Sequence, residues 1–445
     1  MALTGSICRL MKFDKSNVLR EKAHSLIPGG AHVYAKGDDQ YPVNAPGFIE
    51  RGQGCHVWDV DGNEFIEYGM GLRAVALGHG YPSVVEAAHR QMLLGTNFTR
   101  PCPVESKCAE ALASFIPSAE MVKFSKNGSD VTTAAVKLAR AYTGRDMVAV
   151  CGDQPFFSVD DWFMGSTALS AGIPKALQDL TVKFRYNDLD SLRQLFLQYP
   201  GRIAGVILEA ETTVPPAPGF LLGLQELIRE NGAVFILDEM ITGFRWHLGG
   251  AQSYYDLRPD LSTFGKAIAN GFSVGALVGR RELMELGGLH HDKARVFLLS
   301  TTHGAETHAL AAAMETMRIY RTEGVIEHLY RQGELLRSGI QRAIANWSLE
   351  GYFAVLGKEP NLIYATRDEN KKPSQSFRTL FLQETIKRGL LMPSLVVSFS
   401  HTDADIDRTI GGIEEALAVY RKALDEGVGK YLTGRPVKPV FREFN

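Results

Sequence analysis

The sequence contains few cysteines and no excess of charge of either sign. Its five cysteines are scattered over 445 residues without a Cys-x-x-Cys pair, which argues against a disulfide framework and leads us to expect a reducing, cytoplasmic compartment. The 48 lysines and arginines are balanced by 50 aspartates and glutamates. This balance argues against nucleic acid as the main partner, because phosphate binding usually needs a basic surplus.

Long hydrophobic runs are also missing. One of the longest uncharged segments, 212–225, contains three prolines, and it is shorter than the roughly 20 apolar residues that a membrane-spanning helix needs. The N-terminal segment has no apolar core ahead of its charges, so we expect no signal peptide and no membrane association. A content of 45% apolar and 22% charged residues excludes a disordered, collagen-like or coiled-coil chain.

The centre of the sequence alternates strand-like and helix-like segments. Short apolar segments that are typical of buried strands occupy 121–125, 147–150, 203–208, 233–237, 274–278 and 296–299. Helical spacing of apolar residues follows at 130–142, and 221–230 also reads as a helix. This alternation predicts an α/β fold with a mostly parallel central sheet flanked by helices, in which ligands bind at the carboxyl ends of the strands.

The two flanks have a different pattern. The N-terminal flank predicts a helix over 15–26 and a hairpin over 57–65 with Asp61-Gly62 at its turn. The segment after about residue 325 reads as helix, short strands, helix and an extended polar tail. We therefore expect a large domain over 66–324 and a smaller α+β domain formed by 1–65 together with 325–445.

Three short motifs contain side chains with reactive or ligand-binding chemistry. Asp238 follows a buried strand, where an acid either caps the next helix or pairs with a buried cation. Lys266 lies between small and apolar residues; it is either a surface lysine on a loop or a desolvated amine that attacks a carbonyl. The loop 125–129 precedes a helix and would serve as a plain N-cap or as a phosphate-binding cradle.

Taken together, the three motifs are the parts that hold pyridoxal 5′-phosphate (PLP). A cradle binds the phosphate, a buried acid keeps the pyridine nitrogen protonated, and a lysine holds the aldehyde as an imine and moves the proton. Each motif alone has an ordinary structural explanation. Their combination predicts a PLP enzyme.

The chain as a whole resembles fold-type I PLP enzymes. Within them it is most similar to the class III aminotransferases, in the glutamate-1-semialdehyde aminomutase-like branch. The matching motifs run in order along nearly the whole chain: Pro28-Gly29-Gly30, Trp58 to Asn63, Leu77 to Pro82, Asn127-Gly128-Ser129-Asp130, Asp238 to Arg245, and Thr263-Phe264-Gly265-Lys266.

The resemblance implies a role for each matching residue. Lys266 would bind the cofactor as a Schiff base and act as the acid and base, and Asp238 would pair with the pyridine nitrogen. Two threonines of the segment 300–304 would reach the phosphate of a neighbouring subunit's cofactor, which implies a homodimer with shared active sites. The other implied cofactor-binding residues are Asn127, Gly128, Ser129, Phe156, Glu209, Ile241, Thr301 and Thr302.

The chain departs from the family pattern at three places. The usual Tyr-His-Gly is Phe156-Phe157-Ser158, so the hydroxyl and imidazole are gone although Phe156 can still stack on the ring. The usual Glu-Pro is Glu209-Ala210. The aminomutases carry an arginine in an Asn-Ser-Pro-Val-Arg stretch where this chain has His32 to Gln40, and Lys36 would replace that arginine only as a point charge.

These departures shape the expected function. We expect an aminotransferase that moves an amino group from an amino acid, L-glutamate, to a keto or aldehyde acceptor. The segments 28–41 and 156–162 resemble those of aminomutase-like proteins of surface-polysaccharide (lipopolysaccharide) biosynthesis, so the expected acceptor is an oxidised sugar or sugar acid, for example the oxidised C8 of a keto-octulosonate. The candidate substrate-binding residues are Arg73, Lys36, His32 and Tyr34.

Other functions have weaker support in the sequence. An intramolecular aminomutase and a non-catalytic binding protein on the same scaffold are the alternatives, and retention of Lys266 and Asp238 argues against the second. Residues 69–74 match the dinucleotide fingerprint Gly-x-Gly-x-x-Gly/Ala, but a helix-breaking segment follows and no acidic residue closes a second strand. No histidine or cysteine cluster has zinc-ligand spacing, so we expect no metal.

Overall fold

The computed structural model describes residues 11–443, and its contacts divide the chain into two compact units. The first unit comprises the described residues up to Leu72 together with Gly78–Gly80 and His328–Val440. The second comprises Arg73–Leu77, Tyr81–Glu327 and the described residues from Phe441. The domain bounds expected from the sequence stay a prediction. The segment on which the absence of a signal peptide was predicted lies mostly outside the described residues.

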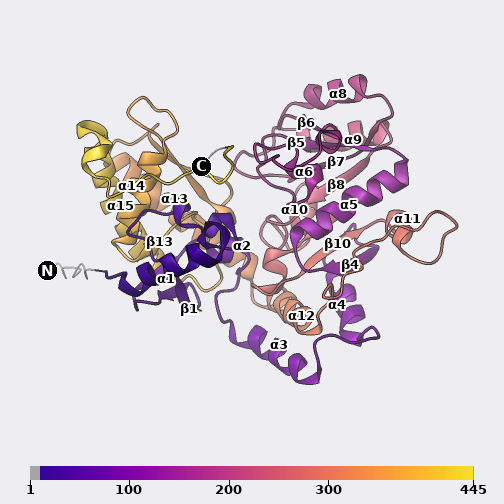
Figure 1. The fold of residues 1–445 in the computed structure, drawn as a ribbon, viewed down its shortest axis with the longest axis horizontal. Coiled ribbons are helices and arrows are strands. Elements are labelled where there is room, and N and C mark those ends of the chain that lie inside the picture. The colour runs from indigo at the N-terminus through magenta and orange to yellow at the C-terminus, as the bar shows by residue number, and fades with distance from the viewer. Residues whose placement is uncertain (1–10, 444–445) are drawn as a thin grey trace. The chain divides into compact units, whose positions relative to one another are not determined.

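The second unit is built around a seven-stranded sheet with the order β4-β10-β9-β8-β7-β5-β6 (Figure 1). Its strands are β4 Met121–Ser125, β5 Met147–Cys151, β6 Thr181–Phe184, β7 Ile203–Leu208, β8 Val234–Asp238, β9 Leu261–Phe264 and β10 Gly275–Gly279. The pairs from β9 to β6 are parallel and β10 runs antiparallel to both of its neighbours. The predicted α/β fold with a mostly parallel sheet is confirmed.

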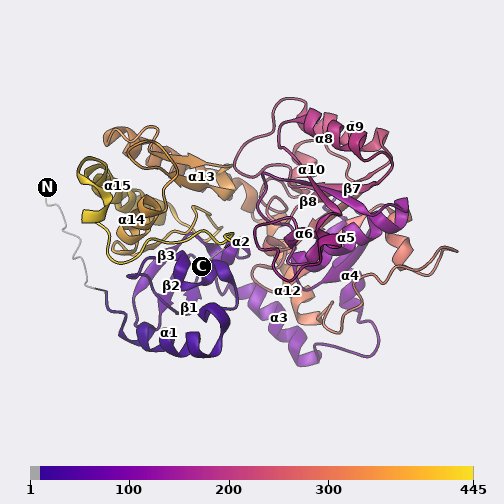
Figure 2. The same cartoon turned by 45° about the horizontal axis from the view of Figure 1, so that its top comes forward.

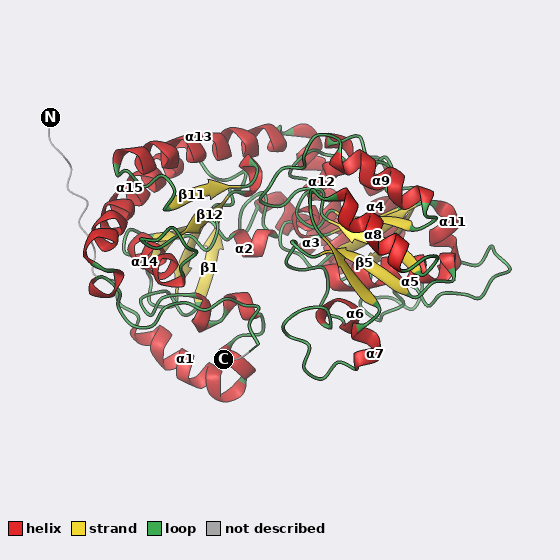
Figure 3. Ribbon diagram, turned by 90° about the horizontal axis from the view of Figure 1, so that it is seen from above, coloured by secondary structure: helices red, strands yellow, loops and turns green. Residues whose placement is uncertain are grey.

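Helices cover both faces of this sheet, which is why five of its strands are buried along their whole length (Figure 3). Helix α5, Gly128–Thr143, packs on one face through Val131, Ala135 and Leu138. Helices α8, Leu189–Gln198, and α9, Phe220–Glu230, pack on the other. Helix α12, Thr307–Thr322, packs against α3, Pro82–Leu94, and α4, Pro103–Ala113.

The first unit combines both ends of the chain (Figure 2). Strands β1 Ile49–Gln53, β2 His56–Asp59, β3 Glu64–Glu67 and β13 Leu390–Leu391 form one sheet, and β11 Phe353–Leu356 pairs with β12 Ile363–Thr366. Its helices are α1 Asp14–Leu26, α14 Gln375–Ile386, α15 Asp403–Glu426 and most of α13 Val325–Asn346. The predicted hairpin is confirmed, because β2 and β3 pair antiparallel.

The segment 296–299 was predicted as a strand, and this prediction is wrong. Val296 and Leu298 are buried while Phe297 is 70% exposed, so the alternation of a strand is present. The segment pairs with no strand, however; its Val296 N–H bonds to the carbonyl of Leu286, and Leu299 turns into the left-handed region at φ 50°. Strands β6 and β9 were not recognised in the sequence.

Among the described residues, no helix is both long and apolar enough to cross a membrane.

Candidate active site

The chemically important side chains follow strands whose carboxyl ends meet at one edge of the seven-stranded sheet. Strands β4, β9, β8 and β7 run in the same direction. Asn127 follows β4, Lys266 follows β9, Asp238 ends β8 and Glu209 follows β7. Parallel sheets bind ligands at this edge. The fold therefore brings together four of the residues that the sequence singled out.

Asp238 is a buried carboxylate with two hydrogen-bond donors. Its side chain is 2% exposed and one oxygen, Oδ1, accepts from the Met240 N–H at 2.9 Å and from the Thr263 hydroxyl at 3.2 Å. Burial raises the pKa of Asp238 to about 6, while the positive charge of Lys266 and the two hydrogen bonds act in the opposite direction. Such an acid is stabilised as an anion by a neighbouring cation.

Lys266 lies directly after β9 with its backbone at φ 48°, in the left-handed region that lysine seldom adopts. Burial lowers the pKa of its amine, and the charges of Asp238 and Glu209 oppose that shift. No hydrogen bond joins its Nζ to any part of the chain that the structure describes. The geometry thus presents a partly desolvated amine, which is the nucleophilic form of lysine.

Glu209 is the second buried acid of the site. Its side chain is 4% exposed, and among the described residues its Oε2 has no hydrogen-bond partner. Burial first, and then the charge of Asp238, raise the pKa of Glu209 to about 8, while Lys266 and Arg73 lower it. A buried carboxyl oxygen without a partner is costly unless another group satisfies it.

The segment predicted as a phosphate cradle is the start of α5, and its role in phosphate binding stays a prediction. Asn127 is the N-cap and its Oδ1 accepts from the Asp130 N–H at 3.0 Å, so the first N–H groups of the helix point out of its N-terminus. Gly275 of β10 packs beneath it, and a Cβ atom there would stand 2.5 Å from the Asn127 carbonyl oxygen. Helix N-termini of this kind bind phosphate.

The loop after β5 is fixed to α5 by hydroxyl groups. The Ser129 hydroxyl accepts from the Val159 N–H at 3.0 Å, and the Thr132 hydroxyl donates to the Phe157 carbonyl at 2.8 Å. Phe157 is buried, whereas Phe156 is 43% exposed and its ring lies 5.9 Å from that of Phe163. The Phe156 ring also lies 6.5 Å from that of Phe441, and the stacking role of Phe156 stays a prediction.

Arg73 stands at the end of a left-handed turn. Met70, Gly71, Leu72 and Arg73 all have positive φ, from 41° to 72°. Arg245 is fully buried and its guanidinium donates to the carbonyls of Arg73 and Ile241. Burial lowers the pKa of Arg73, and the charge of Glu209 raises it, so this cation belongs to the same electrostatic group. The turn also excludes a dinucleotide-binding helix at 69–74.

Six further residues were predicted to take part in the site: Thr301, Thr302, Ile241, His32, Tyr34 and Lys36. Thr301 and Thr302 are exposed in the loop before α12, and the Thr302 carbonyl accepts from Asn97 Nδ2 at 2.9 Å. Ile241 is half-buried, and its part in cofactor binding stays a prediction. The exposed side chains of His32, Tyr34 and Lys36 belong to the first unit, and their part in substrate binding stays a prediction.

One residue that bonds directly to a predicted site residue was missed in the sequence. Gln154 is 4% exposed and its side-chain amide binds the backbone of Glu209 on both sides: Oε1 accepts from the Glu209 N–H at 2.8 Å and Nε2 donates to the Glu209 carbonyl at 2.6 Å. No local pattern identifies such a residue, because its partner lies 55 positions away.

The residues present fit PLP. Lys266 offers an amine without a hydrogen-bond partner in the described chain, Asp238 offers a buried carboxylate beside it, and the α5 N-terminus offers N–H groups for a phosphate. Glu209 Oε2, which has no hydrogen-bond partner in the described chain, belongs to the same site, so this site needs a further polar group.

Comparison with known proteins gives a consistent result. The family model described as aminotransferase class-III matches residues 35–349. Glutamate-1-semialdehyde 2,1-aminomutase of Desulforamulus reducens is 33% identical over 437 residues, which cover 93% of this chain and 99% of that protein. The second glutamate-1-semialdehyde 2,1-aminomutase of Bacillus cereus is 33% identical over 434 residues, with 92% and 99% covered.

Solved structures agree with the fold. The FumI protein of Sphingopyxis sp. MTA144, described in its PLP internal aldimine form, superposes with a TM-score of 0.85 at 26% identity, covering 93% of this chain and 98% of that chain. An omega-transaminase from Sphaerobacter thermophilus gives a TM-score of 0.83 at 26% identity, with 94% and 100% covered.

The fold and the site therefore define a fold-type I PLP transferase, and its cofactor is pyridoxal 5′-phosphate. Within that class the chain belongs to the class-III aminotransferase family.

Proposed function

We propose that this enzyme is an aminotransferase that moves an amino group from an amino acid, L-glutamate, to a keto or aldehyde acceptor. The observation that carries the proposal is the placement of Lys266 and Asp238 after the paired strands β9 and β8, where the charge of the buried carboxylate acts on a lysine amine without a hydrogen-bond partner in the described chain. A binding protein needs neither a nucleophilic amine nor a buried acid beside it, so a non-catalytic function is disfavoured.

PLP, when bound, supplies an electrophilic aldehyde and a ring that accepts electrons from the carbon whose proton is removed. Lys266, Asp238 and the start of α5 each have a separate role in this chemistry. Lys266 binds the cofactor covalently and, once displaced by the donor amine, takes a proton at its Nζ and returns it. Asp238 holds a proton on the pyridine nitrogen. The N–H groups at the start of α5 and the Ser129 hydroxyl hold the phosphate.

The electrostatics of the site support these roles. Burial keeps the pKa of Lys266 low, which favours the neutral amine that accepts a proton. Burial raises the pKa of Asp238 although Lys266 and two hydrogen bonds oppose the shift, so a protonated pyridine nitrogen beside the carboxylate would stabilise its anion through an ionic hydrogen bond.

The acceptor proposed from the sequence is an oxidised sugar or sugar acid, for example the oxidised C8 of a keto-octulosonate. Arg73 supports an anionic acceptor, because its half-buried guanidinium lies in the electrostatic group of Glu209 and Lys266. A guanidinium binds a carboxylate through paired hydrogen bonds, which a neutral sugar does not offer.

An intramolecular aminomutase is the second candidate, because both relatives at 33% identity are named glutamate-1-semialdehyde 2,1-aminomutase. The segment His32 to Gln40 opposes it, since the arginine-bearing stretch of the aminomutases is replaced there. We also propose a homodimer in which the exposed Thr301 and Thr302 of one subunit reach the phosphate bound by the other.

Product analysis separates these functions. The PLP-loaded enzyme is incubated with L-glutamate and, separately, with glutamate 1-semialdehyde. The proposal predicts 2-oxoglutarate from L-glutamate in an amount equal to the enzyme when no acceptor is present, and continued turnover once an oxidised sugar acid is added. Conversion of glutamate 1-semialdehyde to 5-aminolevulinate, without 2-oxoglutarate from glutamate, would establish the aminomutase instead.

A further inference from the structure

We propose that Gln154 is a positioning residue that sets the place of the Glu209 carboxyl beside Lys266 and so tunes the reactivity of that amine. The proposal deepens the proposed function and rests on it, because it concerns the same site. Neither the family motifs nor the sequence pattern assigns a role to Gln154.

The first argument is that Gln154 continues the hydrogen bonding of the sheet beyond the end of β7. Strands β5 and β7 are paired in parallel, with Val150 opposite Ile207, and β7 ends at Leu208. Glu209 therefore has no strand on the β5 side to bond its backbone. The Gln154 amide offers one donor and one acceptor, and it bonds the N–H and carbonyl of Glu209 as a neighbouring strand would.

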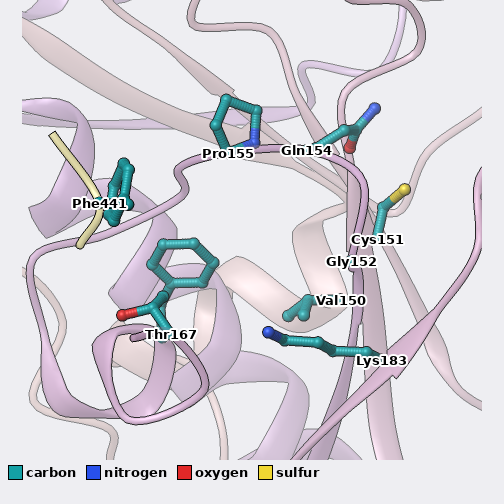
Figure 4. Close-up of a pocket in the computed structure, with 9 residues that line it drawn as sticks. Val150, Cys151, Gly152, Gln154, Pro155, Thr167, Lys183 and Phe441 are labelled. Carbon is teal, nitrogen blue, oxygen red and sulfur yellow. The ribbon is translucent and has the colours of Figure 1, made fainter. Parts of the chain in front are cut away.

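The second argument is that Gln154 is buried at the edge of a cavity and that both polar atoms of its side chain bond to Glu209. It borders a cavity of about 230 Å³, whose lining also includes Pro155, Thr167, Lys183 and Phe441 (Figure 4). Figure 4 shows Pro155 and Gln154 along one edge of this cavity and Lys183 along the opposite edge. A side chain beside open space keeps one rotamer only when its polar atoms are bonded, and both polar atoms of Gln154 are bonded to Glu209.

The third argument is the position of Glu209 itself. Its carboxyl acts electrostatically on Lys266, Asp238 and Arg73, and its Oε2 is buried without a partner in the described chain. No side-chain bond at Oε2 fixes the carboxyl, so its place depends on the backbone from which it projects. A backbone shift of about 1 Å at such a group is enough to change a rate by about 100-fold.

The test compares two isosteric substitutions. Gln154→Met removes both hydrogen bonds and keeps the size of the side chain. Gln383→Met is the matched control, because Gln383 is equally buried and its amide likewise bonds backbone groups, the Tyr431 carbonyl at 2.9 Å and the Thr433 N–H at 2.8 Å, in the first unit. Both variants lose two bonds to backbone groups, and Gln383→Met also loses the bond from Nε2 to Glu384 Oε1 at 3.0 Å.

The test measures the titration of Lys266 in cofactor-free protein. A purely structural role of Gln154 would leave this titration unchanged. It is measured as the pH dependence of reductive methylation of that lysine, by peptide mass spectrometry. Gln154→Met is expected to displace the midpoint in the same direction as Glu209→Gln, and to lower kcat/KM for L-glutamate in the loaded enzyme about 10-fold or more. Gln383→Met is expected to leave the midpoint unchanged and kcat/KM within about twofold of the wild type.

The proposal is overturned if Gln154→Met titrates like the wild type while Glu209→Gln does not. If the methionine variant does not fold, Gln154→Leu, which is also uncharged and also lacks both hydrogen bonds, replaces it with the same criteria. Failure of the proposed function looks different: wild-type enzyme that makes no 2-oxoglutarate from L-glutamate would remove the aminotransferase assignment and leave the titration comparison standing.

Discussion

Asp238 and Thr263 are directly opposite each other in the pairing of β8 with β9, and the threonine hydroxyl donates to the aspartate at 3.2 Å. This register has a consequence for catalysis. The chain leaves β9 one residue after Thr263 and reaches Lys266 two residues later, so the strand pair that orients the acid also places the amine beside it. The pairing of β8 with β9 thus brings these two candidate catalytic residues to the same edge of the sheet.

Removing the lysine should abolish turnover. Lys266→Ala deletes both the covalent attachment and the group that moves the proton, and we expect kcat to fall at least about 10⁴-fold while the fold is retained. The measurement is single-turnover formation of 2-oxoglutarate, together with borohydride reduction and mass spectrometry to detect the covalently attached cofactor. The exposed Lys123 of β4 provides the control, Lys123→Ala, which should keep both. Near-wild-type turnover in Lys266→Ala would show that another group performs the chemistry.

Neutralising Asp238 should slow the reaction without unfolding the protein. In Asp238→Asn no carboxylate remains to hold a proton on the pyridine nitrogen, so kcat should fall about 100-fold or more. Thr263→Val keeps the acid and removes one of its hydrogen bonds, so its loss should be smaller. Rates are compared in stopped-flow absorbance of the bound cofactor. Equal rates in the asparagine variant and the wild type would refute the assigned role.

Closing the space under the cradle should weaken cofactor binding. A Cβ in Gly275→Ala would lie 2.5 Å from the Asn127 carbonyl oxygen, and the atoms that it meets are backbone atoms, which cannot move aside as a flexible side chain would. We expect the Kd for PLP to rise about 10-fold or more, measured by fluorescence titration of the cofactor-free protein. Gly411→Ala is the control, since no atom lies within 4 Å of its Cβ position. Unchanged affinity in Gly275→Ala would place the phosphate elsewhere.

Glu209 should make the cofactor-free protein less stable as pH rises. Its pKa is raised to about 8 in the folded state, so between pH 4.5 and 8 the folded chain holds a proton that the unfolded chain has released. Stability from this group is complete at low pH and is lost as pH rises through about 8. Urea unfolding from pH 5 to 8.5 should show a shallower decline in Glu209→Gln than in the wild type. The exposed Glu110 supplies the control variant Glu110→Gln, and equal slopes in all three proteins would contradict the assignment.

Much of the central sheet could be predicted from the sequence, because most of its strands are short apolar segments separated by turn residues. The strands β4 and β7 were predicted with their observed bounds. Strand β9 was missed because Ser262 and Thr263 interrupt its apolar pattern, although both side chains are fully buried. The segment 296–299 was misassigned, since alternation of apolar residues indicates an extended chain and carries no information about a pairing partner.

Some of the site residues could likewise be predicted from the sequence and others could not. Asp238 and Lys266 were identifiable because each breaks an apolar context with a charge. Gln154 was not, because its importance comes from a contact with Glu209 that only the pairing of β5 and β7 creates. The left-handed turn that ends at Arg73 was equally hidden, since three of its four residues are not glycine.

The central claim is that Lys266, Asp238 and PLP together accept an amino group from an amino acid. The most direct measurement is the absorbance spectrum of the purified protein with PLP, before and after addition of L-glutamate. The account predicts a yellow band from the lysine-bound cofactor that glutamate replaces with the spectrum of pyridoxamine phosphate. Absence of the yellow band in the wild-type protein would contradict the assignment of Lys266, and a band that no amino acid changes would contradict the aminotransferase.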